Sequence, residues 1–160
     1  MSRRHRSRRD CARPSLAEAF PARYGLRMPA QRVGYSKRSR IDKLGLKPDM
    51  RVALLNVEDR WIKRELKERT TDIVESRPRK DTDMILLGID GPTKLKRLAT
   101  VQKSIKRNGM IWAVWPKGQQ HIKEDMIRKA AIQHGLVDVK VMAFSETLSG
   151  LKLVIPVAKR

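Results

Sequence analysis

The side chains that could bind a small molecule lie at or just after the ends of expected strands. They are Asn56, Glu75, Asp90 and Trp115. In an open α/β sheet, ligands bind outside the carboxyl ends of the strands, so these residues would line one cleft. An acidic residue such as Glu75, about 20 residues after the first strand, could accept hydrogen bonds from a ribose diol. The chemistry that this set suggests is the binding of a nucleoside-containing cofactor.

The loop after the first strand lacks the glycines that such a site usually has. Glycines there let the backbone approach a phosphate or a methionine carboxylate. Here the loop reads Asn56-Val57-Glu58-Asp59, with two carboxylates that would repel a phosphate. Without the glycines, a solvated Glu75 at a strand end is the more usual interpretation. We therefore expect no cofactor, and a nucleoside-containing cofactor is the alternative.

A second group of residues could instead bind a partner. Trp115-Pro116-Lys117 would place a flat apolar wall beside a cation that can reach an anion, and Pro116 ends the strand because it has no amide proton. Ser145 and Glu146 begin the loop of the last hairpin and could face the same cleft. The competing interpretation is that Trp115 packs on the core, that Lys117 is a solvated turn residue, and that the loop is an ordinary polar turn.

No arrangement of nucleophile, acid and base is visible in the chain. The sequence has no G-x-S-x-G elbow, no phosphate-binding P-loop and no H-E-x-x-H motif. His121 and His134 lie at opposite ends of one expected helix, too far apart to cooperate. One cysteine and three scattered histidines offer no metal-ligand spacing. We therefore expect neither catalytic residues nor a metal site.

The charge of the chain points to an anionic partner. Its 160 residues include 37 Lys+Arg and 17 Asp+Glu, a formal net charge of +20. A charge of this size would steer the protein toward nucleic acid or acidic proteins. Against nucleic acid, aromatic residues make up only 4% of the chain, which leaves little surface for stacking on bases.

The first residues differ in composition from the rest. Residues 1–27 contain eight Arg and no Lys, whereas residues 28–160 contain 13 Arg and 16 Lys. An arginine arm could neutralise phosphates on a nucleic acid. Its residues would be Arg3, Arg4, Arg6, Arg8 and Arg9. The alternatives are a disordered tail or a true start at Met28. We divide the chain into a basic segment at 1–34 and a single domain at 35–160.

Strands and helices are expected to alternate along this domain. Apolar runs between turn signals predict strands at 50–57, 71–75, 83–90, 110–115, 136–144 and 151–157. Periodicity and capping residues predict helices at 36–44, 58–69, 91–107 and 121–134. The helix at 58–69 would bury Trp61, Ile62 and Leu66. The helix that begins at Gly91-Pro92 would end at Asn108-Gly109.

This alternation predicts an α/β fold, with helices on both faces of a mostly parallel sheet in a three-layer, Rossmann-like arrangement. The last two strands have no helix between them and must form an antiparallel hairpin, with its turn near Ser149-Gly150. No apolar run reaches the ~18 residues that a membrane span needs. The single Cys11 has no partner for an intrachain disulfide, which indicates a reducing compartment. We therefore expect a cytoplasmic protein without a membrane partner.

The order of these elements resembles the class I methyltransferase fold, whose sheet also ends in an antiparallel hairpin. This resemblance covers roughly residues 49–157 and implies no activity by itself. The chain is also similar to a bacterial family, the domain of unknown function numbered 3052. The similarity rests on Gly34-Tyr35-Ser36 and on residues 43–48, 112–117, 135–140 and 149–152. Members of that family begin close to the Gly-Tyr-Ser segment, which implies a start near Met28.

Two residues depart from the pattern of that family. Lys37 stands where a glycine is usual, and Thr147 stands where a tryptophan commonly precedes the Ser-Gly-Leu turn. Together, the observations favour a non-catalytic methyltransferase-like domain that binds an anionic partner. The alternative is an S-adenosylmethionine-dependent methyltransferase with a glycine-poor cofactor loop.

Overall fold

The computed structural model describes residues 39–160, and every structural statement below refers to them. The arginines expected to form a nucleic-acid-binding arm lie outside the described residues, and so does Met28. Their role stays a prediction from the sequence.

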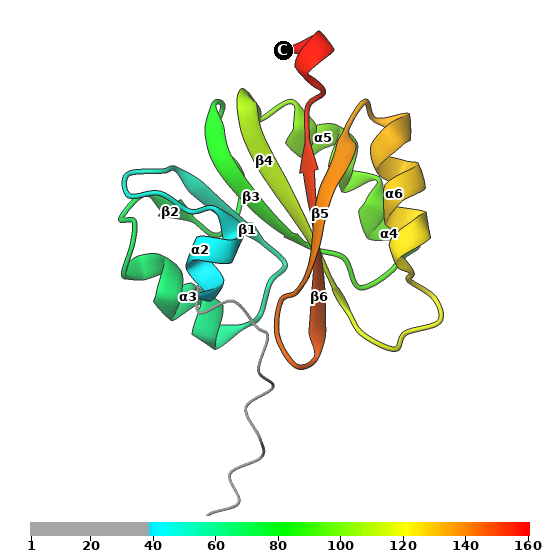
Figure 1. Ribbon diagram of the computed structural model, residues 1–160, viewed down its shortest axis with the longest axis horizontal. Coiled ribbons are helices and arrows are strands. Elements are labelled where there is room, and N and C mark those ends of the chain that lie inside the picture. The colour runs from blue at the N-terminus through cyan, green and yellow to red at the C-terminus, as the bar shows by residue number, and fades with distance from the viewer. Residues whose placement is uncertain (1–38) are drawn as a thin grey trace, which may run out of the picture. The chain divides into compact units, whose positions relative to one another are not determined.

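Six strands in the described part of the chain form one sheet, in the order β2-β1-β3-β4-β6-β5 (Figure 1). Their bounds are β1 Val52–Leu55, β2 Ile73–Val74, β3 Thr82–Gly88, β4 Ile105–Pro116, β5 Val137–Ala143 and β6 Leu148–Val154. The first four strands of the chain pair in parallel. Strand β6 lies between β4 and β5 and is antiparallel to both. The predicted α/β fold, with a mostly parallel sheet that ends in an antiparallel hairpin, is therefore confirmed.

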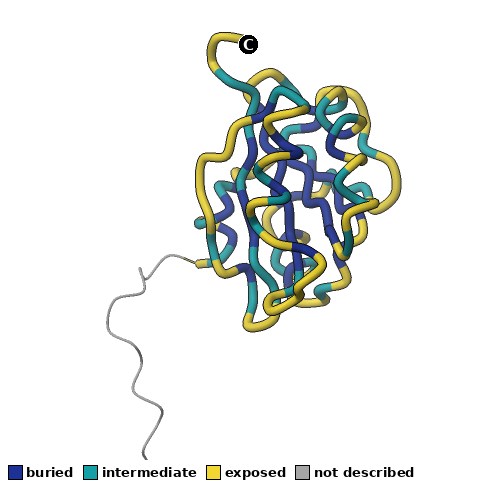
Figure 2. Tube along the Cα trace, turned by 90° about the vertical axis from the view of Figure 1, so that its right-hand side faces the viewer, coloured by how far each residue is buried: buried dark blue, intermediate teal, exposed yellow. Residues whose placement is uncertain are grey.

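Helices cover both faces of this sheet and make two separate apolar clusters. Their bounds are α2 Arg40–Leu44, α3 Arg60–Lys67, α4 Pro92–Leu95, α5 Arg97–Gln102 and α6 Glu124–Gln133, followed by the 3-10 turn η2 Val157–Lys159. On one face α2 and α3 pack around Trp112, and on the other α5 and α6 pack around Ile111. Figure 2 shows the buried strands between exposed outer segments. None of the helices within 39–160 is long and apolar enough to cross a bilayer.

The short helix α2 is fixed at both of its ends. The hydroxyl of Ser39 accepts a hydrogen bond from the amide of Asp42 (3.2 Å), which satisfies one of the free amides of the first turn. Gly45 ends the helix in the left-handed conformation, at φ 82°. Trp112 Nε1 donates a hydrogen bond to the Leu44 carbonyl at 3.1 Å. Because Trp112 is fully buried in β4, this bond ties α2 to the centre of the sheet.

The helix expected over 91–107 differs most from its prediction. It is split into α4 and α5 and ends at Gln102, and residues 105–109 belong to β4. Ile105 is buried in the core and pairs with Thr82 of β3, which requires an extended backbone there. Gly109 is not among the positive-φ glycines of the described residues, so the expected left-handed stop is wrong. Burial of one apolar residue has overridden the helical pattern of its neighbours.

Two details of the other elements are also corrected. Trp61 is 67% exposed, whereas Ile62 and Leu66 are buried as predicted. The turn of the last hairpin lies between Ala143 and Leu148, so Ser149 and Gly150 are inside β6 and not in the turn. Gly150 packs against the rings of Phe144 and Trp112, where a side chain would meet both at 3.4 Å. This glycine serves a close packing contact.

Candidate functional site

The main cavity is a cleft of about 990 Å³ at the carboxyl ends of β1, β3 and β4, closed on one side by the turn between β5 and β6. It is lined by Arg40, residues 56–61, residues 88–90, Val114, Pro116 and residues 145–148. This is the edge of the sheet at which open α/β folds bind ligands. The cleft predicted from the strand ends is therefore present.

The floor of the cleft is a backbone contact between the ends of β1 and β3. Asn56 has φ 56°, in the left-handed region, and its side-chain amide donates to the Gly88 carbonyl at 3.3 Å. A Cβ atom added to Gly88 would lie 1.8 Å from the Asn56 carbonyl oxygen. Any larger residue at position 88 would force the backbone of Asn56 to shift, so this position favours glycine. A glycine does shape this site, although it lies on β3 and not in the loop after β1.

The N-terminus of α3 projects into the cleft with its amides already bound. The Asp59 carboxylate accepts hydrogen bonds from the amides of Trp61 (2.9 Å) and Ile62 (3.2 Å). The same carboxylate lies 3.7 Å from a guanidinium nitrogen of Arg40. A negative charge is thus built into the helix N-terminus, where it is favoured by the helix dipole. This position therefore does not favour a phosphate.

The lining of the cleft is acidic, although the chain is strongly basic. Four of its residues carry carboxylates and two carry guanidinium groups. They are Glu58, Asp59, Asp90 and Glu146, and Arg40 and Arg60. Arg60 forms no ion pair with any carboxylate in the described residues, whereas Arg40 is held between Asp59 and Glu65. The cleft therefore does not favour an anionic ligand.

The hairpin loop at the side of the cleft is held in place by two groups. The hydroxyl of Ser145 accepts hydrogen bonds from the amides of Leu148 (3.0 Å) and Thr147 (3.3 Å). Lys117 Nζ donates to the carbonyls of Ser145 (2.6 Å) and Glu146 (3.2 Å). Lys117 therefore positions the loop and is not a free cation at the edge of the cleft.

The residues predicted for a cofactor divide into two pairs. Asn56 and Asp90 line the cleft. Trp115 is 6% exposed and packs in the core beneath the sheet, as its competing interpretation stated. Glu75 is outside the lining, because Lys63 Nζ of α3 binds its carboxylate at 3.0 Å. The hydrogen bond from Lys63, and the charge of the same ammonium group, hold the pKa of Glu75 below its usual value.

The residues predicted for a partner are also only partly gathered in the cleft. Pro116, Ser145 and Glu146 line it, and Trp115 and Lys117 do not. Arg40, Arg60 and Gly88 line the cleft although the sequence did not predict them, and Trp61 lines it although it was predicted to be buried. Gly88 carried a usable signal, since an isolated glycine within a strand pattern indicates a close backbone approach. Arg40 carried none, because it comes from a helix before the sheet.

Comparisons with known proteins identify the fold. No family model matches the chain, and no curated protein does. A SAM-dependent methyltransferase from Aquifex aeolicus matches with a TM-score of 0.51 and 15% identity, over 72% of this chain and 87% of that one. A proposed methyltransferase from Bacillus halodurans matches with a TM-score of 0.53 and 10% identity, over 64% of this chain and 67% of that one. The fold is that of the class I methyltransferases.

One expectation from the sequence is corrected by these neighbours. The absence of glycines after β1 had led us to expect no cofactor. The chain instead shares its fold with a protein that depends on S-adenosylmethionine, and its glycine-poor loop still leaves an open cleft at the carboxyl ends of its parallel strands. The lack of a glycine pattern was therefore not sufficient ground for excluding a cofactor.

Proposed function

We propose that the chain binds S-adenosylmethionine in the cleft and is a methyltransferase that depends on it. The observation that carries this proposal is the open cleft at the carboxyl ends of β1, β3 and β4, lined by Asn56 and Asp90, in a chain with the methyltransferase fold. The mainly acidic lining supports it further. Fold alone would carry no activity, so the chemistry of the lining decides.

The charged groups of the cleft are complementary to the charges of this cofactor. S-adenosylmethionine carries a sulfonium, an ammonium and a carboxylate, and is a cation overall. The carboxylates of Glu58 and Asp90 would bind its ammonium group or its ribose hydroxyls. The unpaired guanidinium of Arg60 would bind its carboxylate, since Arg binds this group with two parallel hydrogen bonds. The excess of carboxylates that argues against an anion here supports a cationic ligand.

When bound, the cofactor would supply a methyl group on a positively charged sulfur. The chain's own part is to hold the site in shape. His121 Nε2 lies 2.9 Å from the Asp90 carbonyl and steadies the backbone on that side. Lys117 and Ser145 hold the hairpin loop on the other side. A preorganised site loses less free energy to ordering on binding.

The test is thermal unfolding of the full chain with and without S-adenosylmethionine. At a concentration of ~100 times the dissociation constant, a true ligand stabilises the folded state by about 2.7 kcal/mol, which raises the midpoint by several degrees. Asp90→Asn should reduce this rise, because it removes a charged hydrogen-bond acceptor worth about 1.5–3 kcal/mol. Asp125→Asn removes an exposed carboxylate of α6 that is not part of the lining; it is the matched control and should behave like the wild type.

If the wild type unfolds cooperatively and its midpoint does not respond to S-adenosylmethionine, the proposal is wrong. It is also wrong if Asp125→Asn weakens the response as much as Asp90→Asn. Conversion to S-adenosylhomocysteine with candidate methyl acceptors then tests the reaction itself.

A second candidate is the non-catalytic domain that captures an anionic partner. The observation that favours its non-catalytic part is the N-terminus of α3, where Asp59 occupies the amides that a cofactor could otherwise use. The acidic lining argues against an anion in the cleft, so such a partner would need another surface. A response to S-adenosylmethionine without turnover of any acceptor would favour this candidate.

A further inference from the structure

The edge of the sheet opposite the cleft carries an excess of cations. Residues 76–83 lead into β3, and residues 103–107 lead into and begin β4. Together these two segments contain six Lys and Arg residues and two Asp residues. They are Arg77, Arg79, Lys80, Lys103, Lys106 and Arg107, against Asp81 and Asp83. We call these two segments the basic edge.

The two segments lie side by side at the starts of neighbouring parallel strands. The amide of Thr82 donates to the Ser104 carbonyl at 2.9 Å, and Thr82 pairs with Ile105. Neighbouring strands are about 4.8 Å apart, so cations on the two segments can reach neighbouring phosphates. Cations that are dispersed along the sequence are therefore gathered by the pairing of β3 with β4.

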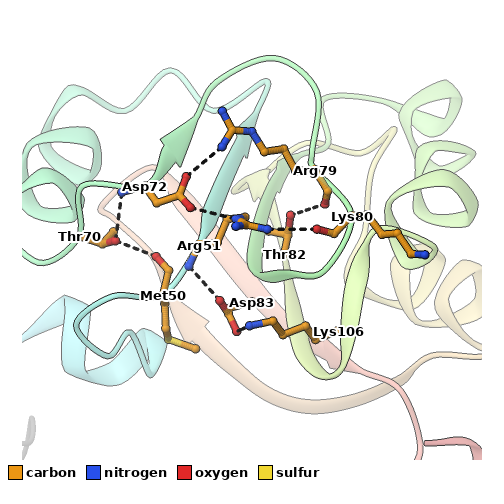
Figure 3. A network of polar contacts seen from close by, with 9 residues as sticks. All are labelled: Met50, Arg51, Thr70, Asp72, Arg79, Lys80, Thr82, Asp83 and Lys106. Carbon is orange, nitrogen blue, oxygen red and sulfur yellow. Dashed lines mark hydrogen bonds and ion pairs between the residues drawn. The ribbon is translucent and has the colours of Figure 1, made fainter.

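A polar network holds these segments rigid from inside (Figure 3). Arg51 Nε binds the Asp72 carboxylate at 2.9 Å, and its Nη1 donates to the Lys80 carbonyl at 3.2 Å. The Thr82 hydroxyl donates to the Arg79 carbonyl, and Lys106 Nζ binds Asp83 at 2.8 Å. The backbone that presents Lys80 is thus fixed before any ligand arrives, which lowers the entropic cost of binding.

Four exposed cations of the basic edge are unpaired. Arg77, Lys80, Lys103 and Arg107 form no ion pair with a carboxylate between residues 39 and 160, and the last three are the ones substituted below. The basic edge contains two acidic residues. Asp83 pairs with Lys106, and the exposed Asp81 forms none of these ion pairs. Unpaired exposed cations on a rigid backbone are suited to neutralising phosphates.

We infer that the basic edge binds the phosphate backbone of a nucleic-acid duplex, without reading its sequence. The chain offers no aromatic residue in either segment, so bases of a single strand would have nothing to stack on. None of the large exposed apolar residues of the described chain lies there either. Membrane surfaces and protein partners usually require such apolar anchors. This site is separate from the cleft and does not depend on the proposed methyltransferase function.

The test is binding of the full chain to a fluorescent 20-base-pair DNA duplex over a range of salt concentrations. For a duplex, each phosphate contact adds about 0.9 to the magnitude of the slope of log K against log salt. Lys80→Gln/Lys103→Gln/Arg107→Gln should therefore lower that magnitude by about 2.7. Lys67→Gln/Lys96→Gln/Arg97→Gln removes the same charge from exposed side chains elsewhere and should leave the slope unchanged. Residues 1–38 are present in every variant, so any contribution they make cancels in the difference.

An RNA duplex of the same sequence is measured in parallel, and a loss of slope on either duplex supports the proposal. Equal slopes for the wild type and the triple variant would overturn it, and so would an equal loss in the control variant. Binding of vesicles containing phosphatidylserine or of polyglutamate, with no binding of either duplex, would also overturn it. Thermal unfolding of each variant confirms that these exposed substitutions leave the fold intact.

Discussion

Gly88 brings two backbones into contact at the floor of the cleft. A methyl group at this position would lie 1.8 Å from the Asn56 oxygen and 2.7 Å from its carbonyl carbon. Both of these atoms belong to the backbone of Asn56, which directly follows β1, so this segment would have to move away from β3. The close approach of the ends of β1 and β3 therefore depends on the absence of a side chain at position 88.

Gly88→Ala should lower the free energy of unfolding by about 3 kcal/mol, the upper end of the usual cost of overpacking, because the added Cβ would meet backbone atoms. Urea unfolding measures the change. Gly91→Ala is the matched control: it lies three residues further on, and its added Cβ would meet no atom within 4 Å. A loss in the control as large as that in Gly88→Ala would show that the close approach is not the cause.

Asp83 makes the stability of the basic edge depend on pH. Burial by itself raises the pKa of Asp83, but the hydrogen bonds from Lys106 and from the Arg51 amide outweigh this effect, and the pKa lies below its ordinary value of 3.8. A carboxyl with a lowered pKa stabilises the fold above its unfolded pKa, and this contribution is lost as the pH falls through the folded value.

Asp83→Asn should therefore be less stable than the wild type at pH 7, and the difference should shrink as the pH falls below about 4. Urea unfolding of both proteins at pH 7, 5 and 3 measures it. A difference that stayed constant over this range would mean that the carboxylate charge contributes nothing. A difference that grew toward low pH would mean that the pKa is raised.

The helix α3 begins at the cleft because Asp59 caps it. Removing this cap by Asp59→Ala should cost about 1 kcal/mol of stability, the usual value for the loss of an N-cap side chain. Glu68→Ala removes a carboxylate from the other end of α3, where it meets only Arg64 across one turn, and should change stability by less than about 0.5 kcal/mol. Equal losses in the two variants, measured by urea unfolding, would contradict a capping role for Asp59.

Local patterns predicted the elements well where one signal dominated. The ends of α2 and α6 followed from Gly45 and Gly135, which both adopt the left-handed conformation. The i, i+4 spacing of Asp59 with Lys63 and of Glu65 with Arg69 predicts ion pairs along α3. Neither pair forms, because Lys63 binds Glu75 and Arg69 binds Asp42. Their partners come from distant parts of the chain, and spacing along one helix cannot show them. The same holds for Arg40, which the fold brings to the cleft from before the sheet.

The molecule as a whole separates two kinds of charge at opposite ends of the same strands. Carboxylates predominate around the cleft where β1 and β3 end, and cations predominate where β3 and β4 begin. The net charge was visible in the sequence and predicted an anionic partner. Its uneven distribution was not visible, since residues 76–83 and 103–107 become neighbours only through the pairing of β3 with β4. The alternation of strands and helices predicted at which edge of the sheet the cleft lies, but it did not predict whether the lining of that cleft is acidic or basic.

The position of β6 in the sheet determines when the sheet can be completed during translation. Strand β5 is synthesised before β6, yet β6 lies between it and β4. Until the ribosome has added β6, β5 has no strand to pair with and its backbone groups must stay in water. A nascent chain that stops before Leu148 would also lack the hydrogen bond from the Leu148 amide to the Ser145 hydroxyl, which helps to hold the hairpin loop. The cleft is therefore completed late in translation, and a chain interrupted there would expose an unpaired β4 edge to its neighbours.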